Sequence, residues 1–380
     1  MGGQKASCLP LGVGVSATLG AFAAAVVVAA HHVARRRQGV SNVGETIVRR
    51  ILPGGRGKKR PAKKAASPRY TGEEGSKKWR RDPHYTQWHK DYVENEHLTR
   101  DPSTALGKEF RAKFRIPYNL FEDIVEATRA SGLFPDEQVS RRGARPHPLS
   151  FKVMAALRRL ALGRSFDGLE ELSGISREVL SKFIPAWEQW FLEEYFEEHV
   201  RMPRNVEELE EAVNLFSMCG LPGCISSMDV VHVRYDRCPH DQRYFHTGRQ
   251  HYSSLGFQFH ASHNRRIYYV GQNFPGARND KTVVRSDGML ERLASDPLYK
   301  DFEYTVYTAT GEEIVMRGVW ALCDGGYHKR PHTICGNKHA DEDRDKAWSG
   351  LCESARKDVE CVFWNSEAKV RTSEGFFPGL

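Results

Sequence analysis

The change in hydrophobic periodicity near residue 219 places the strongest constraint on the fold. Up to about residue 216, apolar residues recur at helical spacing, as in FRIPYNLFEDIVEAT and SFKVMAALRRLALG. Glycine and proline in CGLPGC (219–224) then mark a boundary. Beyond it, strands are predicted for ISSMDVVHVRYD, SSLGFQFHASH, RRIYYVGQNFPG and GVWALCDGGY, and helices for TVVRSDGMLERLA and LCESARKDVECVF. This order predicts an α/β layer fold in residues 217–380, preceded by a helical domain in residues 86–216.

The helical domain contains a segment that resembles a helix-turn-helix. Ser150 is a predicted N-cap and Gly163 a predicted end for the helix in SFKVMAALRRLALG. A helix over about 167–172 is expected to end at Gly174, and a second to begin at Ser176, capped by its side chain. Such a pair can place its second helix in the DNA major groove, or it can be a plain helical hairpin that packs against the next domain.

Positive charge is concentrated ahead of these domains. The chain carries a net +8, and residues 35–81 hold 16 Lys and Arg against three acidic residues, so the rest of the chain is mildly acidic. Few large apolar residues occur in residues 35–85, so this linker is predicted to be disordered. Lys58, Lys59 and Arg60 are predicted to contact DNA phosphates or to act as a nuclear import signal; the alternative is a solvated linker.

Residues 1–34 form an apolar N-terminal segment. Ala6 to Ala34 carry no Asp, Glu, Lys or Arg, and three arginines follow. Residues 8–34 could therefore anchor the chain in a membrane, serve as a targeting segment, or be a plain extension. The eight cysteines are scattered singly, which favours reduced thiols inside the cell over a disulfide framework.

Three acidic residues stand where metal-dependent phosphodiester chemistry needs them. Asp229 lies within a strand-forming run, Asp324 closes the apolar strand GVWALC, and Glu360 lies on the last helix. Hydrolysis of DNA can use two divalent cations, and Mg²⁺ prefers carboxylate oxygens as ligands. Each acid also has a structural alternative: a strand-end turn for Asp229, a cap of the Gly-Gly turn for Asp324, and an ion pair with Arg356 for Glu360.

The order strand acid, strand-end acid and helix glutamate, with 35 residues between Asp324 and Glu360, is the order of an RNase H-like nuclease. The blocks SSMDVVHVRYDRCP, RYFHTGRQHY, NFPGARNDKTVVRSD, ALCDGGYHKRP and ESARKDVECVF together resemble the PIF/Harbinger transposases and the related plant transposon proteins. FRIPYNLFEDIVE and HPLSFKVMAALRRLALGRSFDGLEELSGIS resemble the helical region of the same family.

This resemblance implies an RNase H-like catalytic core in which Asp229, Asp324 and Glu360 bind two Mg²⁺ or Mn²⁺ ions. The implied activity is that of a DDE endonuclease or transposase, which excises DNA and joins it to a target. Asp280 matches a recurrent acid of the family, and we expect it to cap a helix or to support the metal ligands. Transposon ends, target DNA, a Myb-like DNA-binding protein and further copies of the chain are the expected partners, and the nucleus is the expected location.

The resemblance weakens after VECVF, where Trp364 replaces a glycine that the family usually has. The nuclease domain is therefore expected to be shortened at its C-terminus, and a catalytically inactive, transposase-derived DNA-binding protein is the alternative function.

Two further clusters are candidates for binding sites. Arg243 and Arg249 are interleaved with histidines and aromatic residues around a predicted hairpin. They could bind the DNA backbone, or they could lie in an ordinary solvated turn. A second cluster could hold structural zinc, although its spacing matches no usual zinc finger: Cys323, His328, His332, Cys335 and His339.

Overall fold

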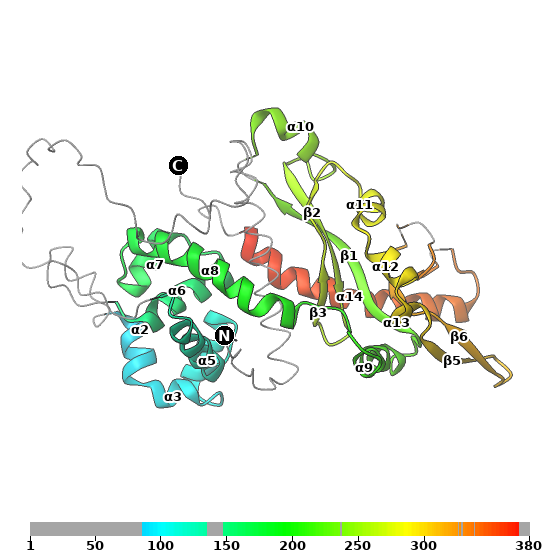
Figure 1. The fold of residues 1–380 in the computed structure, drawn as a ribbon, viewed down its shortest axis with the longest axis horizontal. Helices are drawn as coiled ribbons and strands as arrows, with labels where there is room; N and C mark the ends of the chain where they lie inside the picture. Colours follow the sequence, from blue (N-terminus) through cyan, green and yellow to red (C-terminus); the bar gives the residue numbers. More distant parts are fainter. Residues whose placement is uncertain are drawn as a thin grey trace, which may run out of the picture.

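The computed structural model describes residues 86–134, 147–235, 238–325, 327, 330–337 and 339–371, with side chains as far as residue 362. The apolar segment and the basic linker with Lys58, Lys59 and Arg60 lie outside the described residues, as does His328. Within the described part, no helix is long and apolar enough to span a membrane. The expected α/β class is confirmed, with a helical part that precedes a mixed sheet (Figure 1).

The helical part forms a core of its own. Its elements are, in chain order, α2 (Gln87–His89), the π-helical turn η3 (Lys90–Glu94), α3 (Glu96–Arg100), α4 (Ala105–Phe114), α5 (Tyr118–Ala130), α6 (Leu149–Leu162), α7 (Phe166–Ser173) and α8 (Arg177–His199). Trp187, Phe110, Phe114 and Phe151 are among its fully buried side chains. Figure 1 shows the long helix α8 running from this core toward the sheet.

The helix ends differ in part from the expected ones. Gly163 and Gly174 end α6 and α7 in the left-handed conformation, with φ of 63° and 69°, as glycine allows. However, α6 begins at Leu149 after Pro148, so Ser150 is not its N-cap. Ser176 is the N-cap residue of α8, but its side chain makes no cap hydrogen bond; a carboxylate oxygen of Glu170 accepts the Arg177 N–H instead, at 2.9 Å.

The main sheet combines antiparallel and parallel strands. Its strands are β1 (Cys224–Arg234), β2 (Ser254–Ala261), β3 (Ile267–Val270), β4 (Phe274–Pro275), β7 (Trp320–Leu322) and β8 (Thr333–Ile334). Along the order β3-β2-β1-β7-β8, β1 pairs antiparallel with β2 and parallel with β7, and β7 pairs parallel with β8. β4 pairs with β2.

Helices cover both faces of this sheet. On one face, Val231 and Val233 of β1 pack with Val359 and Val362 of α14 (Asp343–Arg371). On the other face, Met228 and Val230 pack with three helices: α9 (Val206–Ser217), α11 (Asp280–Asp287) and α12 (Met289–Ser295). The helix α9 precedes the expected domain boundary at residue 217 but belongs to the core of the sheet, because Leu209 and Val213 pack there.

Several elements depart from the expected pattern. The helix expected in TVVRSDGMLERLA is split into α11 and α12 at Gly288, whose φ is 86°. The sequence analysis did not anticipate α13 (Pro297–Lys300) or the separate hairpin of β5 (Glu303–Tyr307) and β6 (Glu313–Arg317). The hairpin expected around Arg243 is a 3-10 turn η4 (His240–Gln242), the short helix α10 (Arg243–His246) and a single bridge between Thr247 and Ser253.

Candidate active site

Asp229 and Glu360 meet around one arginine on the α14 side of the sheet. Nη1 of Arg356 lies 2.7 Å from Oε1 of Glu360 and 3.7 Å from Oδ2 of Asp229. The expected i,i+4 pair between Glu360 and Arg356 is therefore present, and Asp229 joins it from β1. Two of the three acids singled out in the sequence, far apart along the chain, thus contact the same guanidinium.

Strand register brings Asp324 to the same end of the sheet. Leu322 of β7 pairs with Ser227 of the parallel strand β1, and Asp324 and Asp229 each follow two residues later. Residues two apart on a strand point to the same face, and neighbouring strands lie about 4.8 Å apart. Since Ser227 and Leu322 both contact α14 or its core, the register directs Asp229 and Asp324 toward α14, with Asp324 just beyond the end of β7.

Burial disfavours the charged forms of the side chains at this site. Asp229 is 22% exposed, and burial raises the pKa of its carboxyl to about 6, although hydrogen bonds from the Val230 N–H and the Tyr327 hydroxyl and the charge of Arg356 lower it. Burial opposes the charge of Arg356 as well, but Glu360, Glu353 and Asp229 raise its pKa. The arginine therefore supplies the positive charge that this group of carboxylates requires.

Asp280 pairs with a histidine of β1 and is not the helix cap. The N-cap of α11 is Asn279, whose side chain accepts a hydrogen bond from the Thr282 N–H. Asp280 instead places Oδ1 3.0 Å from Nε2 of His232 on β1, and its charge raises the pKa of Asp229. The cap interpretation is therefore wrong, because the asparagine one residue earlier takes that role.

Sequence reasoning missed Arg356 as a link between the acids, and it also missed Tyr327 and His232. The Tyr327 hydroxyl donates to Oδ1 of Asp229 at 3.0 Å. The only signals available in the sequence were that Arg356 stands four residues before Glu360 and that Tyr327 and His232 each stand three residues after a candidate acid.

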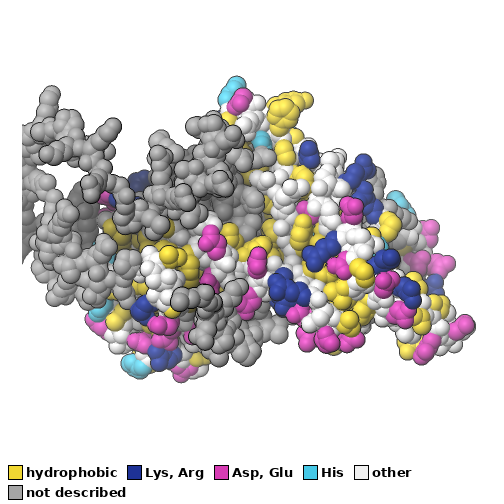
Figure 2. Space-filling view, viewed as in Figure 1, with side chains coloured by type: hydrophobic (Ala, Val, Ile, Leu, Met, Phe, Trp, Pro, Cys, Tyr) yellow, Lys and Arg dark blue, Asp and Glu magenta, His cyan; other side chains and the backbone are white. Residues whose placement is uncertain are grey.

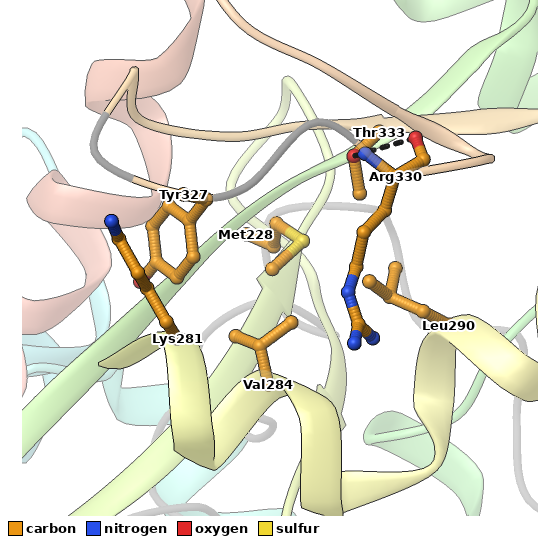
Figure 3. Close-up of a pocket in the computed structure, with 7 residues that line it drawn as sticks. All are labelled: Met228, Lys281, Val284, Leu290, Tyr327, Arg330 and Thr333. Carbon is orange, nitrogen blue, oxygen red and sulfur yellow. Dashed lines mark hydrogen bonds between the residues drawn. The ribbon is translucent and has the colours of Figure 1, made fainter. Parts of the chain in front are cut away.

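A pocket adjoins the acids on the other face of the sheet. Figure 3 shows Tyr327 and Lys281 on one side of it and Arg330 on the other, with Met228 between them. Val284, Leu290 and Thr333 complete its lining. The pocket is small, with room for about one water molecule, and it places two cationic side chains one residue along β1 from Asp229.

The geometry of the described residues does not by itself form a metal site. Within the described part of the chain, no three His, Cys, Asp or Glu side chains gather closely enough to hold a metal ion. The carboxylate donors suit a hard cation such as Mg²⁺ or Mn²⁺, but Arg356 stands between two of them. In the alternative zinc cluster, Cys323 and Cys335 contact each other, whereas Nδ1 of His332 lies 2.8 Å from the Val319 carbonyl oxygen.

Arg243 and Arg249 lie away from the acids, in and after α10. Both are exposed, and the neighbouring rings of Tyr244 and Phe245 are 84% and 61% exposed. Figure 1 shows α10 beyond one end of β2, and Figure 2 shows hydrophobic side chains exposed at this tip and Lys and Arg side chains over α11 and α12. The role of Arg243 and Arg249 in DNA binding stays a prediction.

Comparison with known proteins relates this part of the chain to proteins encoded by transposons. Over residues 197–373 the sequence matches the family model of the plant transposon proteins. Protein ALP1-like from Arabidopsis thaliana is 25% identical over 187 residues, which cover 48% of this chain and 44% of that relative. The match thus spans less than half of the relative's length. No solved structure shows a significant match.

Proposed function

We propose that the chain is a metal-dependent DNA endonuclease or transposase of the DDE type, with an RNase H-like catalytic core. The single observation that carries the proposal is the meeting of Asp229 and Glu360 at Arg356. The register of Asp324 beside Asp229 supports it, as do the sheet with its antiparallel and parallel sides and the match to plant transposon proteins.

In this proposal, Asp229, Asp324 and Glu360 hold two Mg²⁺ or Mn²⁺ ions. Such ions, when bound, polarise the phosphate and activate water or a 3′-hydroxyl. The Tyr327 hydroxyl orients the Asp229 carboxylate, and Asp280 with His232 supports it from α11. Arg356 balances the carboxylate charge in the metal-free protein and must give way when the acids bind a metal ion.

DNA is the proposed substrate and target. Lys281 and Arg330, at the pocket on the other face of the sheet, would contact phosphates there, whereas Arg243 and Arg249 would contact the duplex further away. A Myb-like partner, assembly of several copies and a nuclear location remain predictions from the resemblance.

A nicking assay with the full chain tests the proposal. We expect conversion of supercoiled plasmid DNA to the nicked form in Mn²⁺, and a loss of at least about 100-fold in Asp229→Asn and Glu360→Gln, since even supporting residues of metal sites cost 10–100-fold. Asp343→Asn, an exposed acid at the start of α14, is the matched control and should cut as the wild type does. Cutting by Asp229→Asn at the wild-type rate would reject the assignment.

The same assay distinguishes the proposed endonuclease from the alternative function. DNA binding by the wild type that is weakened by salt, with no nicking in Mn²⁺ or Mg²⁺, would indicate a catalytically inactive, transposase-derived DNA-binding protein.

A further inference from the structure

A cysteine, a histidine and an aspartate line up at a place that the proposed nuclease does not use. Cys219 follows α9, His263 lies in the turn between β2 and β3, and Asp358 lies on α14. The Cys219 Sγ atom lies 3.2 Å from Nε2 of His263, and Nδ1 of His263 lies 2.6 Å from Oδ2 of Asp358. Three separate elements thus converge on one histidine.

This cluster is distinct from the group of carboxylates. Asp358 and Glu360 are two residues apart on α14, so they point roughly 200° apart around the helix axis. His263 lies just past Ala261 at the end of β2, which pairs with Ser227, so the cluster sits toward the start of β1, whereas Asp229 lies in the middle of that strand. The two sites therefore share α14 but use different sides of it.

The order of atoms matches an activated nucleophile. A thiol within hydrogen-bond reach of an imidazole, which in turn contacts a carboxylate, can pass its proton to the ring while the carboxylate stabilises the resulting positive charge. The ring of Phe216 packs against His263 with a centroid distance of 5.5 Å, and Arg265 contacts the other oxygen of Asp358, with Nε 3.6 Å from Oδ1. Nδ1 of His263 and Oδ2 of Asp358 are within ion-pair distance, but their geometry is not that of a hydrogen bond.

Cys219 and His263 both lie in a partly exposed part of the surface. Cys219 is half-buried, its neighbours Met218 and Gly220 are exposed, and the His263 side chain is 37% exposed. Cys219 is also a free thiol. The thiol and the imidazole therefore lie near solvent and not in the core.

The backbone argues against acyl transfer at this cysteine. An oxyanion intermediate needs free N–H donors beside the nucleophile. The two amides that follow Cys219 are already engaged: the Gly220 N–H donates to the Ser217 carbonyl at 2.9 Å, and the Leu221 N–H donates to the Phe216 carbonyl at 3.0 Å. The cluster can activate sulfur, but these amides give it no oxyanion hole.

We propose that Cys219 is a reactive thiol that peroxides oxidise, with His263 as the base and Asp358 as the residue that positions it. The thiol proton passes to Nε2 of His263, the sulfur attacks one oxygen of hydrogen peroxide, and the O–O bond breaks. The leaving hydroxide takes the proton from the imidazolium and departs as water, so the sulfur is oxidised to a sulfenic acid and the peroxide is reduced. A small external thiol can then condense with the sulfenic acid to a mixed disulfide and release a second water.

Cysteine-resolved labelling of the full chain tests this proposal without any assay of DNA cutting. Each cysteine is alkylated with iodoacetamide at pH 7 and quantified by peptide mass spectrometry. We expect Cys219 to react about 10-fold faster than the half-buried Cys335 and Cys361 in the same sample, because an ordinary thiol is only a few per cent thiolate at this pH. Hydrogen peroxide followed by dimedone should label Cys219 first.

Two variants identify the cause of the reactivity. His263→Gln should slow alkylation of Cys219 about 10-fold and Asp358→Asn by a smaller factor, while the rates of Cys335 and Cys361 stay unchanged. His251→Gln, an exposed histidine elsewhere, is the matched control. If a variant unfolds, its buried Cys224 becomes reactive and reveals the unfolding. In that case, the ratio of the alkylation rates of Cys219 and Cys361 in the wild type still tests the proposal. Equal rates for Cys219 and Cys361, or an unchanged rate in a folded His263→Gln, would overturn the proposal.

Discussion

The guanidinium of Arg356 lies 2.7 Å from Glu360, one turn further along α14, and the same nitrogen also contacts Asp229 of β1. Arg356 links the helix acid Glu360 to the strand acid Asp229. Among the described residues, no other cation forms an ion pair with either acid. A helix acid and a strand acid that lie far apart along the chain therefore share one cation.

Replacement of Arg356 by methionine should lower the stability of the metal-free protein and increase the stabilisation by Mn²⁺. The metal-free protein should lose roughly 1–3 kcal/mol of stability, a value between those of exposed and buried ion pairs. Stabilisation by Mn²⁺ should increase, because the arginine charge repels a cation placed between the same carboxylates. Thermal unfolding with and without Mn²⁺ measures both effects, with Lys357→Met, an exposed neighbour, as the control. Identical behaviour of the two variants would contradict this role for Arg356.

Loss of the Tyr327 hydroxyl should make Asp229 harder to ionise. Its hydrogen bond to Oδ1 lowers the pKa of Asp229, which burial holds at about 6. In Tyr327→Phe we expect this pKa to rise by about one pH unit, as the loss of a hydrogen bond to a charged group implies. Carboxyl NMR titration of the metal-free protein measures the change. Tyr307→Phe, on the exposed hairpin, is the control, and an unchanged Asp229 pKa in Tyr327→Phe would argue against the hydrogen bond.

The arginines of the α10 region should contribute to DNA affinity through charge. Replacement of Arg243 and Arg249 by alanine should weaken binding and reduce the slope of log affinity against log salt by roughly 2, the value for two phosphate contacts. Titration of a labelled duplex at several salt concentrations measures the slope. Arg317→Ala, on the exposed strand β6, controls for general loss of charge. A slope equal to that of the wild type would place the DNA elsewhere on the molecule.

The buried pair of Glu188 and Arg159 should make stability depend on pH. Burial raises the pKa of Glu188 from 4.5 to about 7, against the effect of Arg159, whose Nε lies 3.9 Å away. An acid with a raised pKa contributes stability below its unfolded pKa and loses that contribution as pH rises through the folded value. Between pH 4 and pH 8, the stability of Glu188→Gln relative to the wild type should therefore improve by roughly 3 kcal/mol.

Chemical denaturation across this pH range tests the Glu188 prediction. Glu194→Gln, an exposed position on the same helix, is the control. A difference between Glu188→Gln and the wild type that does not change with pH would show that the carboxyl does not titrate in this range.

Local sequence signals predicted elements better than they predicted contacts. The alternation in SSLGFQFHASH gave the strand β2, and the glycines at 163 and 174 gave helix ends, because these features depend on neighbouring residues alone. The sequence analysis missed the hairpin of β5 and β6: β5 alternates only between exposed and half-buried residues, and every residue of β6 is exposed, so its apolar residues do not alternate with polar ones. Asp280 was misjudged as a cap because Asn279 competes for the same role one residue earlier.

The sequence by itself determined the α/β class and the order of the main strands, and it singled out three acids: one within the first strand, one just after β7 and one on the last helix. Only the tertiary structure decided that Arg356 lies between Asp229 and Glu360, that Tyr327 donates to Asp229, and that Cys219, His263 and Asp358 meet. The physical reason is that strand and helix patterns arise from spacing along the chain, whereas these contacts depend on strand register and on which side of α14 packs against the sheet.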